Sequence, residues 1–440
     1  MKARLVPVYF PNRDDGFDQQ VDHLRRLLAD TADILDPAPL GAPIHSADAV
    51  VFPQVLGDAY RMVDAIRAID VPILFITSEF GTTSMWDWEI GSYLRGEGIA
   101  TFAPYTLDQA RSLCRALSVK RTLKSTKFLA YQDNTGEGFQ PSIFKRFYWW
   151  EHEAVQRLFD RFGIRILYKS FREMGAEAQA IPDAEAEAVW EAWQSRLNIA
   201  HMPRKSLLSA LKVYVQMKRE LDADLTIGGI GINCLNESHF SDTTPCLAWN
   251  MLYEERGLIW GCEADIIAML TEYLLNKSLD APIMMTNLYP FLMGQAALKH
   301  ERIAAFPAVE SEPENHILVA HCGYLGVLPQ SFATMWELRP KVLAIVDDNA
   351  TAIDARLPEG PITLAKVHAD FKTMTVAEGE LTGYAQFPGS DCLNGGVIRV
   401  HDGDRLMHAL ASHHYILAAG HRLHEIQMIA DVFSLHVEAI

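Results

Sequence analysis

The alternation of short apolar runs with amphipathic helical segments constrains the fold of this chain more than any other feature. Residues 5–10, 49–52 and 71–76 are apolar runs of strand length, and residues 17–28 carry apolar side chains at helical spacing. A strand–helix–strand rhythm builds parallel sheets, because each right-handed crossover helix packs back onto the sheet. The sequence therefore predicts an α/β fold with doubly wound, Rossmann-like domains. No GxGxxG motif follows the first strand, so a dinucleotide site is not supported.

The same rhythm continues to about residue 300. The further segments expected in this part are helices at 60–69, 176–193, 207–221 and 246–254 and strands at 164–168 and 225–232. In open parallel sheets, binding sites lie at the carboxyl ends of the strands. The polar residues that follow the strand-like runs are therefore the first candidates for a functional site.

From about residue 300 onward, strands predominate. The strand-like runs are residues 317–320, 362–367, 397–400 and 415–418, and Gly, Pro and Asp separate them. A helix at 424–435 is expected to close the chain. This pattern predicts a mostly antiparallel C-terminal β domain. The expected division is an N-terminal α/β domain over residues 1–130, a middle α/β domain over 131–300 and a C-terminal β-rich domain over 301–440.

The net charge and the cysteine spacing indicate which partners and which cellular compartment to expect. The net charge of −17 argues against a nucleic-acid partner, since binding to a phosphate backbone requires clustered Lys and Arg. No apolar run approaches the ~20 residues that span a bilayer, so no membrane partner is expected. The first residues lead into a strand without a cleavage signature, and the six cysteines form no CxxC pair. We therefore expect a cytoplasmic protein whose cysteines are reduced.

Three acidic residues follow strand-like runs in the middle of the chain. Glu237 comes shortly after residues 225–232, and Glu263 and Asp265 follow Gly261-Cys262 at the start of a long apolar run. Acids at neighbouring strand ends can converge on one point, and carboxylate oxygens suit Mg²⁺ and Mn²⁺. For Glu263 and Asp265, the alternative is a helix N-terminus, where acids cap free N–H groups. For Glu237, the alternative is an ordinary polar loop.

Histidines add nitrogen donors to this set. His413 and His414 precede the strand-like run 415–418, where an imidazole can bind a metal ion. The alternative is a loop pair with one ring packed and the other solvated. His321 follows the apolar run 317–320 and is a site candidate, although a hydrogen-bonded core histidine explains its position nearly as well.

Together these motifs resemble those of the L-fucose isomerase and L-arabinose isomerase superfamily. The segments that carry the resemblance are residues 231–237, 261–267, 320–323, 393–397 and 412–420. Their order and spacing are similar to the C-terminal two-thirds of fucose-isomerase-like proteins, whereas the N-terminal third matches only as a βαβ pattern.

The resemblance implies a Mn²⁺ site, with Mg²⁺ or Co²⁺ as alternative ions. In that family a Glu, an Asp and a His hold the ion, and two sugar oxygens complete its shell. By motif these ligands are Glu237, Asp265 and His414, with His413 as the alternative histidine. Glu237 and Asp265 are also the implied acid/base pair. The residues implied to bind substrate are Glu263, which is also a possible ligand, and His321, His413 and Trp88.

The same resemblance implies a homo-oligomer. Family members form trimers or hexamers in which N-terminal domains complete a neighbour's pocket. On that basis Glu79, Trp86 or Trp88 is expected to reach an adjacent site. An ordinary surface turn is the alternative for Glu79, and core packing is the alternative for Trp88.

The implied activity is that of a metal-dependent aldose–ketose isomerase, an intramolecular oxidoreductase of carbohydrate metabolism. Its expected substrate is a free monosaccharide, a deoxy-sugar or a pentose, and the reaction passes through an enediol. A carboxylate moves the proton from C2 to C1, and a divalent cation stabilises the charge that forms on the oxygens. Two alternatives stay open. One is another metal-dependent carbohydrate reaction, such as epimerisation, aldol cleavage or hydrolysis, and the other is a non-catalytic sugar-binding protein.

Overall fold

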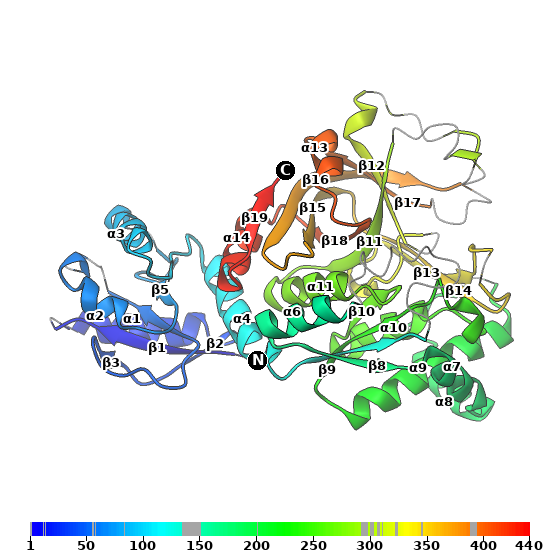
Figure 1. Cartoon of the computed structure of the whole chain (residues 1–440), viewed down its shortest axis with the longest axis horizontal. Coiled ribbons are helices and arrows are strands. Elements are labelled where there is room, and N and C mark those ends of the chain that lie inside the picture. Colours follow the sequence, from blue (N-terminus) through cyan, green and yellow to red (C-terminus); the bar gives the residue numbers. More distant parts are fainter. Residues whose placement is uncertain are drawn as a thin grey trace. The chain divides into compact units, whose positions relative to one another are not determined.

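The chain is divided into two compact units in the computed structural model (Figure 1). The structure describes all residues except 1, 12, 14, 55–56, 58, 83, 134–150, 200, 292–297, 300–302, 306–308, 310, 322–323, 345 and 388–393. The first unit comprises Met1–Thr122, Lys277–Asp280 and His424–Ser434, and the second comprises Leu123–Asn276, Ala281–Leu423 and Leu435–Ile440. Among the described helices, none combines the length and the apolarity needed to traverse a bilayer.

The first unit is built on a parallel sheet with the strand order β2-β1-β4-β5-β6, and β3 pairs with β1. Its strands are β1 (Ala3–Tyr9), β2 (Ala32–Ile34), β3 (Ala38–Pro39), β4 (Ala49–Phe52), β5 (Ile73–Phe75) and β6 (Thr101–Phe102). All of these pairings are parallel. The chain therefore winds outward from β1 in both directions, which confirms the predicted strand–helix alternation.

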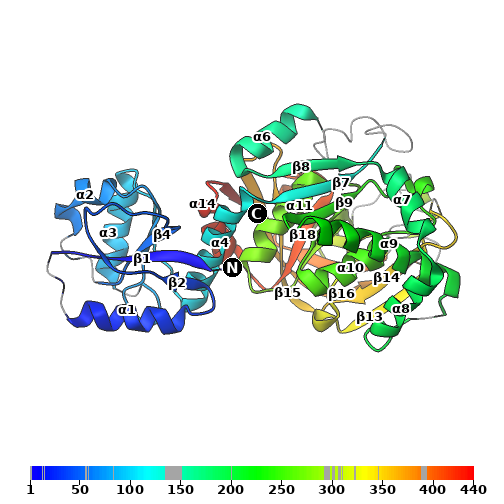
Figure 2. The same cartoon turned by 90° about the horizontal axis from the view of Figure 1, so that it is seen from below.

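Helices lie on both faces of this sheet (Figure 2). α1 (Asp15–Leu27) lies on one face, and α2 (Val63–Arg67) and α3 (Met85–Gly96) lie on the other. The unit also contains nearly all of α4 (Leu107–Leu123) and α14 (Leu423–Val432). Phe52 and Phe75 are fully buried and stack with their ring centroids 5.9 Å apart. The aromatic pair fills the core that the apolar strand runs predicted.

The second unit contains a smaller parallel sheet with the order β10-β9-β7-β8. Its strands are β7 (Lys127–Tyr131), β8 (Arg165–Lys169), β9 (Ile227–Ile232) and β10 (Ile259–Cys262). The associated helices are α6 (His152–Phe162), α7 (Phe171–Ala180), α8 (Asp183–Trp193), α9 (Arg204–Ala223), α10 (Cys246–Arg256) and α11 (Ile266–Ser278). Because β9 and β10 are neighbours, the polar residues that follow them emerge at the same edge of the sheet.

The same unit contains an antiparallel sheet that closes on itself. Its order is β15-β18-β11-β12-β17-β16, and pairing of β15 with β16 completes the ring. Its strands are β11 (Ile283–Pro290), β12 (His316–Ala320), β15 (Gly360–Val367), β16 (Thr373–Ala385), β17 (Gly395–Val400) and β18 (His414–Ala419). The hairpin β13 (Met335–Pro340) and β14 (Thr351–Arg356) and the short helix α13 (Gly403–His408) complete the unit. The strand-rich, mostly antiparallel C-terminal region is thus confirmed, as a closed barrel.

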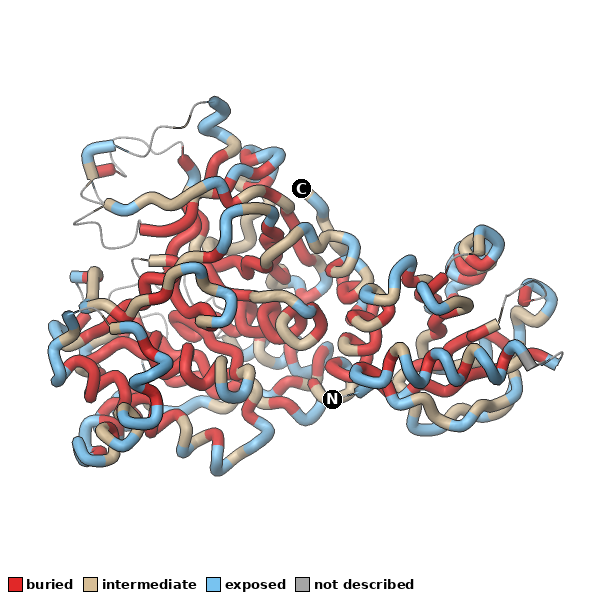
Figure 3. The backbone as a smooth tube through the Cα atoms, turned by 180° about the vertical axis from the view of Figure 1, so that it is seen from behind, coloured by how far each residue is buried: buried red, intermediate tan, exposed pale blue. Residues whose placement is uncertain are grey.

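Helix α11 joins the parallel sheet to the barrel. Gly261 of β10 has no side chain where Met269 of α11 packs, and a Cβ there would lie 2.6 Å from the Met269 Cγ. On the barrel side, the Thr271 hydroxyl accepts a hydrogen bond from the backbone of Val367 on β15 at 3.1 Å. Nearly every residue of α11 is buried, as expected for a helix with packed neighbours on all sides. Figure 3 shows the buried backbone concentrated in the interior of this unit.

Three expectations about local structure were wrong. The segment 176–193 is part of two helices, α7 and α8, because Pro182 has no N–H to continue the first helix. The segment 60–69 is divided into a 3₁₀ turn (Ala59–Arg61) and the short α2. The expected terminal helix, α14, does not close the chain. It is followed by β19 (His436–Ala439), which pairs in parallel with β16.

Candidate metal centre

The turn between β10 and α11 has an uncommon backbone conformation. Glu263 and Ala264 both have a φ of +54°, in the left-handed region that non-glycine residues rarely adopt. Such a residue costs about 1–2 kcal/mol, and two in succession require support from their surroundings. That support includes hydrogen bonds from the N–H of Ala264 to the carbonyl of Ile232, at 3.0 Å, and from the N–H of Asp265 to Cys262, also at 3.0 Å. The turn therefore sets the positions of Glu263 and Asp265.

Asp265 is fully buried and accepts hydrogen bonds from three elements. Its Oδ1 accepts from the N–H of Ala268 in the first turn of α11 at 2.8 Å. Its Oδ2 lies 3.1 Å from the Lys366 Nζ on β15 and 2.9 Å from the His414 Nδ1 on β18. Burial alone raises the pKa of the Asp265 carboxyl, but Lys366 and His414 outweigh it and hold this pKa well below its usual range. Asp265 is thus both the predicted helix cap and an ionised partner of the histidine.

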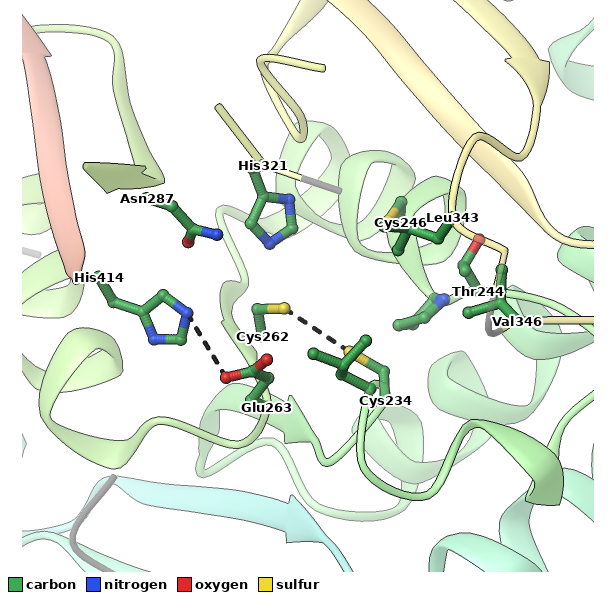
Figure 4. A pocket seen from close by; sticks show the side chains of 12 residues that line it. Cys234, Thr244, Cys246, Cys262, Glu263, Asn287, His321, Leu343, Val346 and His414 are labelled. Carbon is green, nitrogen blue, oxygen red and sulfur yellow. Dashed lines mark hydrogen bonds and ion pairs between the residues drawn. The ribbon is translucent and has the colours of Figure 1, made fainter. Parts of the chain in front are cut away.

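The bond to Asp265 determines which nitrogen of His414 faces the rest of the centre. An ionised carboxylate can only accept, so Nδ1 carries the proton in this hydrogen bond. In a neutral ring, the lone pair is then on Nε2, which lies 3.8 Å from the Glu263 Oε2 (Figure 4). A carboxylate that orients a metal-binding imidazole in this way is a recurrent feature of metal sites.

Glu263, His413 and His414 form the group of described residues that is closest to a metal-binding geometry. Each offers one donor atom, and these three atoms lie within 4.8 Å of one another. Burial, followed by the neighbouring His414, lowers the pKa of His413 well below its usual value, which favours the neutral ring that binds metals. Two imidazole nitrogens and one carboxylate oxygen fit Mn²⁺, Co²⁺, Fe²⁺ or Zn²⁺ better than Mg²⁺, which prefers oxygen ligands.

A small cavity of about 50 Å³ lies beside this group. Glu263, His414, Asn287 and His321 line its polar side. Apart from Thr244, the rest of the lining is apolar or sulfur-containing and consists of Cys234, Leu235, Pro245, Cys246, Cys262, Leu343 and Val346. In Figure 4, Asn287 of β11, His414 of β18 and His321, which follows β12, lie on the side of the cavity away from Leu343 and Val346. The cavity is therefore suited to a ligand with one polar and one apolar end.

The barrel register explains why three of the polar residues meet. Asn287 of β11 pairs with His414 on one side and with Ala320, the residue before His321, on the other. The Nδ2 of Asn287 donates to the Tyr289 hydroxyl at 3.3 Å, whereas its buried Oδ1 has no hydrogen-bond partner among the described residues. This oxygen is an available acceptor for a ligand hydroxyl or a water molecule.

His321 lies at the end of β12 with its side chain 1% exposed. The ring packs edge-on against Trp260, with the centroids 4.8 Å apart. Gly326 has a φ of +101°, and a Cβ there would lie 2.9 Å from the His321 Nδ1. His321 also lines the cavity, and its role in substrate binding stays a prediction.

Two other predicted residues, Glu237 and Trp88, are not among the described residues that line the cavity. Glu237 is buried, and both of its carboxylate oxygens lie 3.0 Å from the backbone N–H of Asp133. Trp88 belongs to α3 of the first unit, where its ring lies 6.3 Å from that of Tyr105. The roles of Glu237 as a ligand and of Trp88 in substrate binding stay predictions.

Sequence reasoning missed Lys366 and Asn287. Lys366 interrupts the apolar run 362–367, and a lysine in such a strand is a signal of a buried ion pair. Asn287 follows an apolar run as well, but nothing in the sequence indicates its pairing with His414. Cys322 and Gly323 of the third motif and Leu393 of the fourth lie outside the described residues.

The chain was also compared with known proteins. No protein-family model matches it. No curated protein matches it either.

Proposed function

We propose that the chain is a metal-dependent aldose–ketose isomerase that acts on a free monosaccharide. The observation that carries the proposal is the buried Asp265–His414–Glu263 arrangement at the edge of a cavity that is also lined by Asn287, whose Oδ1 has no partner among the residues that the structure describes. The proposal includes the superfamily assignment, with two doubly wound domains and a C-terminal β domain. It also includes a cytoplasmic location and assembly into a trimer or hexamer.

Glu263, His413 and His414 are the proposed ligands in the arrangement described here. The ligand set expected from the resemblance shares His414 but uses Glu237 and Asp265. A divalent cation at this point would polarise the sugar carbonyl and stabilise negative charge on the neighbouring oxygens. Asp265 holds the His414 ring through its Nδ1, and Asn287 and His321, which line the cavity, are the proposed partners of sugar hydroxyls.

Isomerisation also requires a group that moves a proton between C2 and C1. Asp265 is a weak base for this step, because its pKa is lowered and three donors already occupy its oxygens. Two carboxylates are therefore compared: Glu263, which lines the cavity, and Glu237, which the resemblance favours. Glu→Gln substitution removes the base in either case but preserves the shape of the side chain.

The test is a panel of free aldopentoses and deoxy-aldohexoses incubated with the Mn²⁺-loaded protein in D₂O. We expect ketose formation with deuterium at C1, and loss of turnover on addition of a chelator. A carbohydrate product other than a ketose would replace the isomerase with another metal-dependent reaction. Sugar binding without any product would instead indicate a binding protein.

Glu237→Gln and Glu263→Gln distinguish the two candidates for the base. If Glu237 transfers the proton, Glu237→Gln abolishes turnover while Mn²⁺ affinity and folding are kept. If Glu263 is a ligand, Glu263→Gln weakens Mn²⁺ binding itself. Normal turnover of Glu237→Gln would remove Glu237 from the mechanism.

A further inference from the structure

Lys366 is a lysine on the barrel strand β15. It is among the largest fully buried side chains, with 1% of its surface exposed. Its strand, β15, is otherwise apolar near this point, with Leu364 and Val367 fully buried. A buried ammonium group is strongly unfavourable unless it is paired, and an apolar residue of similar size would fill the same space without that penalty. Packing alone therefore does not account for the lysine.

The partner of Lys366 is also the partner of His414. The same oxygen, Oδ2 of Asp265, lies 3.1 Å from the Lys366 Nζ and 2.9 Å from the His414 Nδ1. The second oxygen of Asp265 is held by the backbone of α11. Three donors from α11, β15 and β18 thus fix one carboxylate. The side chains of Asp265, Lys366 and His414 are all buried.

The ammonium group also sets the charge balance of the centre. Asp265 and Glu263 are two carboxyl groups on the same short turn, and both approach His414. Lys366 pairs with the Asp265 carboxylate, so that Glu263 is the carboxyl group that offers an oxygen beside His413 and His414. Without the lysine, the Asp265 carboxylate would be free to turn toward a bound cation and to release the His414 Nδ1.

We propose that Lys366 is a positioning residue of the metal centre. Its charge keeps Asp265 bonded to the His414 Nδ1, so that His414 presents Nε2 to the cation and Asp265 stays outside the ligand set. This inference depends on the part of the proposed function that places a cation at the centre, and it is independent of the sugar reaction. Its immediate consequence concerns metal affinity and not catalysis.

The experiment measures Mn²⁺ binding by isothermal titration without sugar, for wild-type protein and for Lys366→Met, Asp265→Asn and the double variant. We expect Lys366→Met to weaken Mn²⁺ binding roughly 10- to 100-fold, as changes in outer-shell partners do. Because Lys366 acts through Asp265, the double variant should bind Mn²⁺ no more weakly than Asp265→Asn alone. If the double variant instead lost Mn²⁺ affinity by the product of the losses in the two single variants, the proposal would be contradicted.

Lys127→Met is the matched control. Lys127 is also a strand lysine of the second unit paired with an aspartate, Asp224, at 2.7 Å. Neither residue lines the cavity. The Mn²⁺ affinity of the Lys127→Met variant should stay within about twofold of the wild-type affinity. Wild-type affinity in a folded Lys366→Met variant, judged by circular dichroism, would overturn the proposal, and so would a wild-type protein that binds no divalent cation.

A second measurement does not depend on the folding of any variant. In metal-free wild-type protein with ¹⁵N-labelled histidine, the His414 ring should show the tautomer with hydrogen on Nδ1. The signal is assigned by its loss in His414→Gln. A ring with hydrogen on Nε2 alone would contradict the inference. If Lys366→Met loses Mn²⁺ affinity while no aldose is isomerised, the positioning role holds and the proposed activity fails.

Discussion

The Oδ2 of Asp265 accepts a hydrogen bond from the Nδ1 of His414 at 2.9 Å, although 149 positions separate the two residues in the sequence. The aspartate comes from the start of α11, at the edge of the parallel sheet, and the histidine begins β18 of the barrel. The centre therefore forms only when these two layers pack together. A change that disturbs the packing of these two layers should therefore disrupt the centre even where the local structure is kept.

Replacing His414 tests the ligand assignment directly. His414→Gln removes an imidazole nitrogen from the centre and breaks the bond to Asp265, so we expect Mn²⁺ affinity to fall by at least about tenfold. Isothermal titration measures the loss. His436→Gln, at an exposed histidine on β19, is the control and should bind Mn²⁺ like wild type. An unchanged affinity in His414→Gln would remove this residue from the ligand set.

Acidic pH should destabilise the metal-free protein through His413. Its pKa is lowered in the folded state, so the unfolded chain binds more protons below about pH 6.5, the pKa of a free histidine. The contribution of His413 to stability is therefore complete above about pH 6.5 and is lost as the pH falls toward its folded pKa. Urea unfolding at pH 7.5 and pH 5.5 measures this loss. His413→Asn should lose less stability over this interval, and an equal loss would refute the assignment.

Cys234 and Cys262 should form a disulfide under mild oxidation. Their Sγ atoms lie 3.7 Å apart at the ends of the neighbouring strands β9 and β10, and a disulfide requires about 2.05 Å. Hydrogen peroxide would take two electrons and two protons from the thiols and yield water. Peptide mapping under non-reducing conditions detects the linked pair. Cys114 is the internal control, because burial raises the pKa of its thiol to about 12 and keeps it unreactive. A linkage that involves Cys114 instead would contradict this prediction.

Gly261→Ala should destabilise the protein. The added Cβ would lie 2.6 Å from both the Cγ and the Sδ of Met269, so either the Met269 side chain or α11 must shift. We expect a loss of about 1–3 kcal/mol in the free energy of unfolding, as for other overpacked cores. Urea unfolding measures this change. Gly383→Ala is the control, since a Cβ at Gly383 would meet no atom within 4 Å. Similar losses in the two variants would argue against the contact with Met269.

The alternation of apolar runs was sufficient to predict the parallel sheets. Short strands such as β4 and β9 are apolar throughout because both faces of a parallel sheet are covered, and this pattern is visible without any tertiary information. Placing Glu263 and Asp265 at a strand end followed from the same reasoning. The helix break at Pro182 was also present in the sequence, but the Ala- and Glu-rich segments on either side favoured a single helix.

The composition of the centre could be predicted only in part. The spacing of Glu263 and Asp265 does not reveal two successive residues with a φ of +54°, which give the two side chains different partners. The pairing of Asn287 with His414 joins strands that are more than a hundred residues apart, and strand order in a closed barrel cannot be derived from periodicity. Lys366 was missed for the same reason, since its partner Asp265 lies 101 positions away.

The first unit is assembled from both ends of the chain. The Lys120 ammonium group donates to the carbonyl oxygen of Val432, near the end of α14, at 2.7 Å. During synthesis, the first 122 residues leave the ribosome long before α14 exists. That unit can reach its final packing only after α14 has been translated, which couples its maturation to that of the sheet and barrel encoded in between.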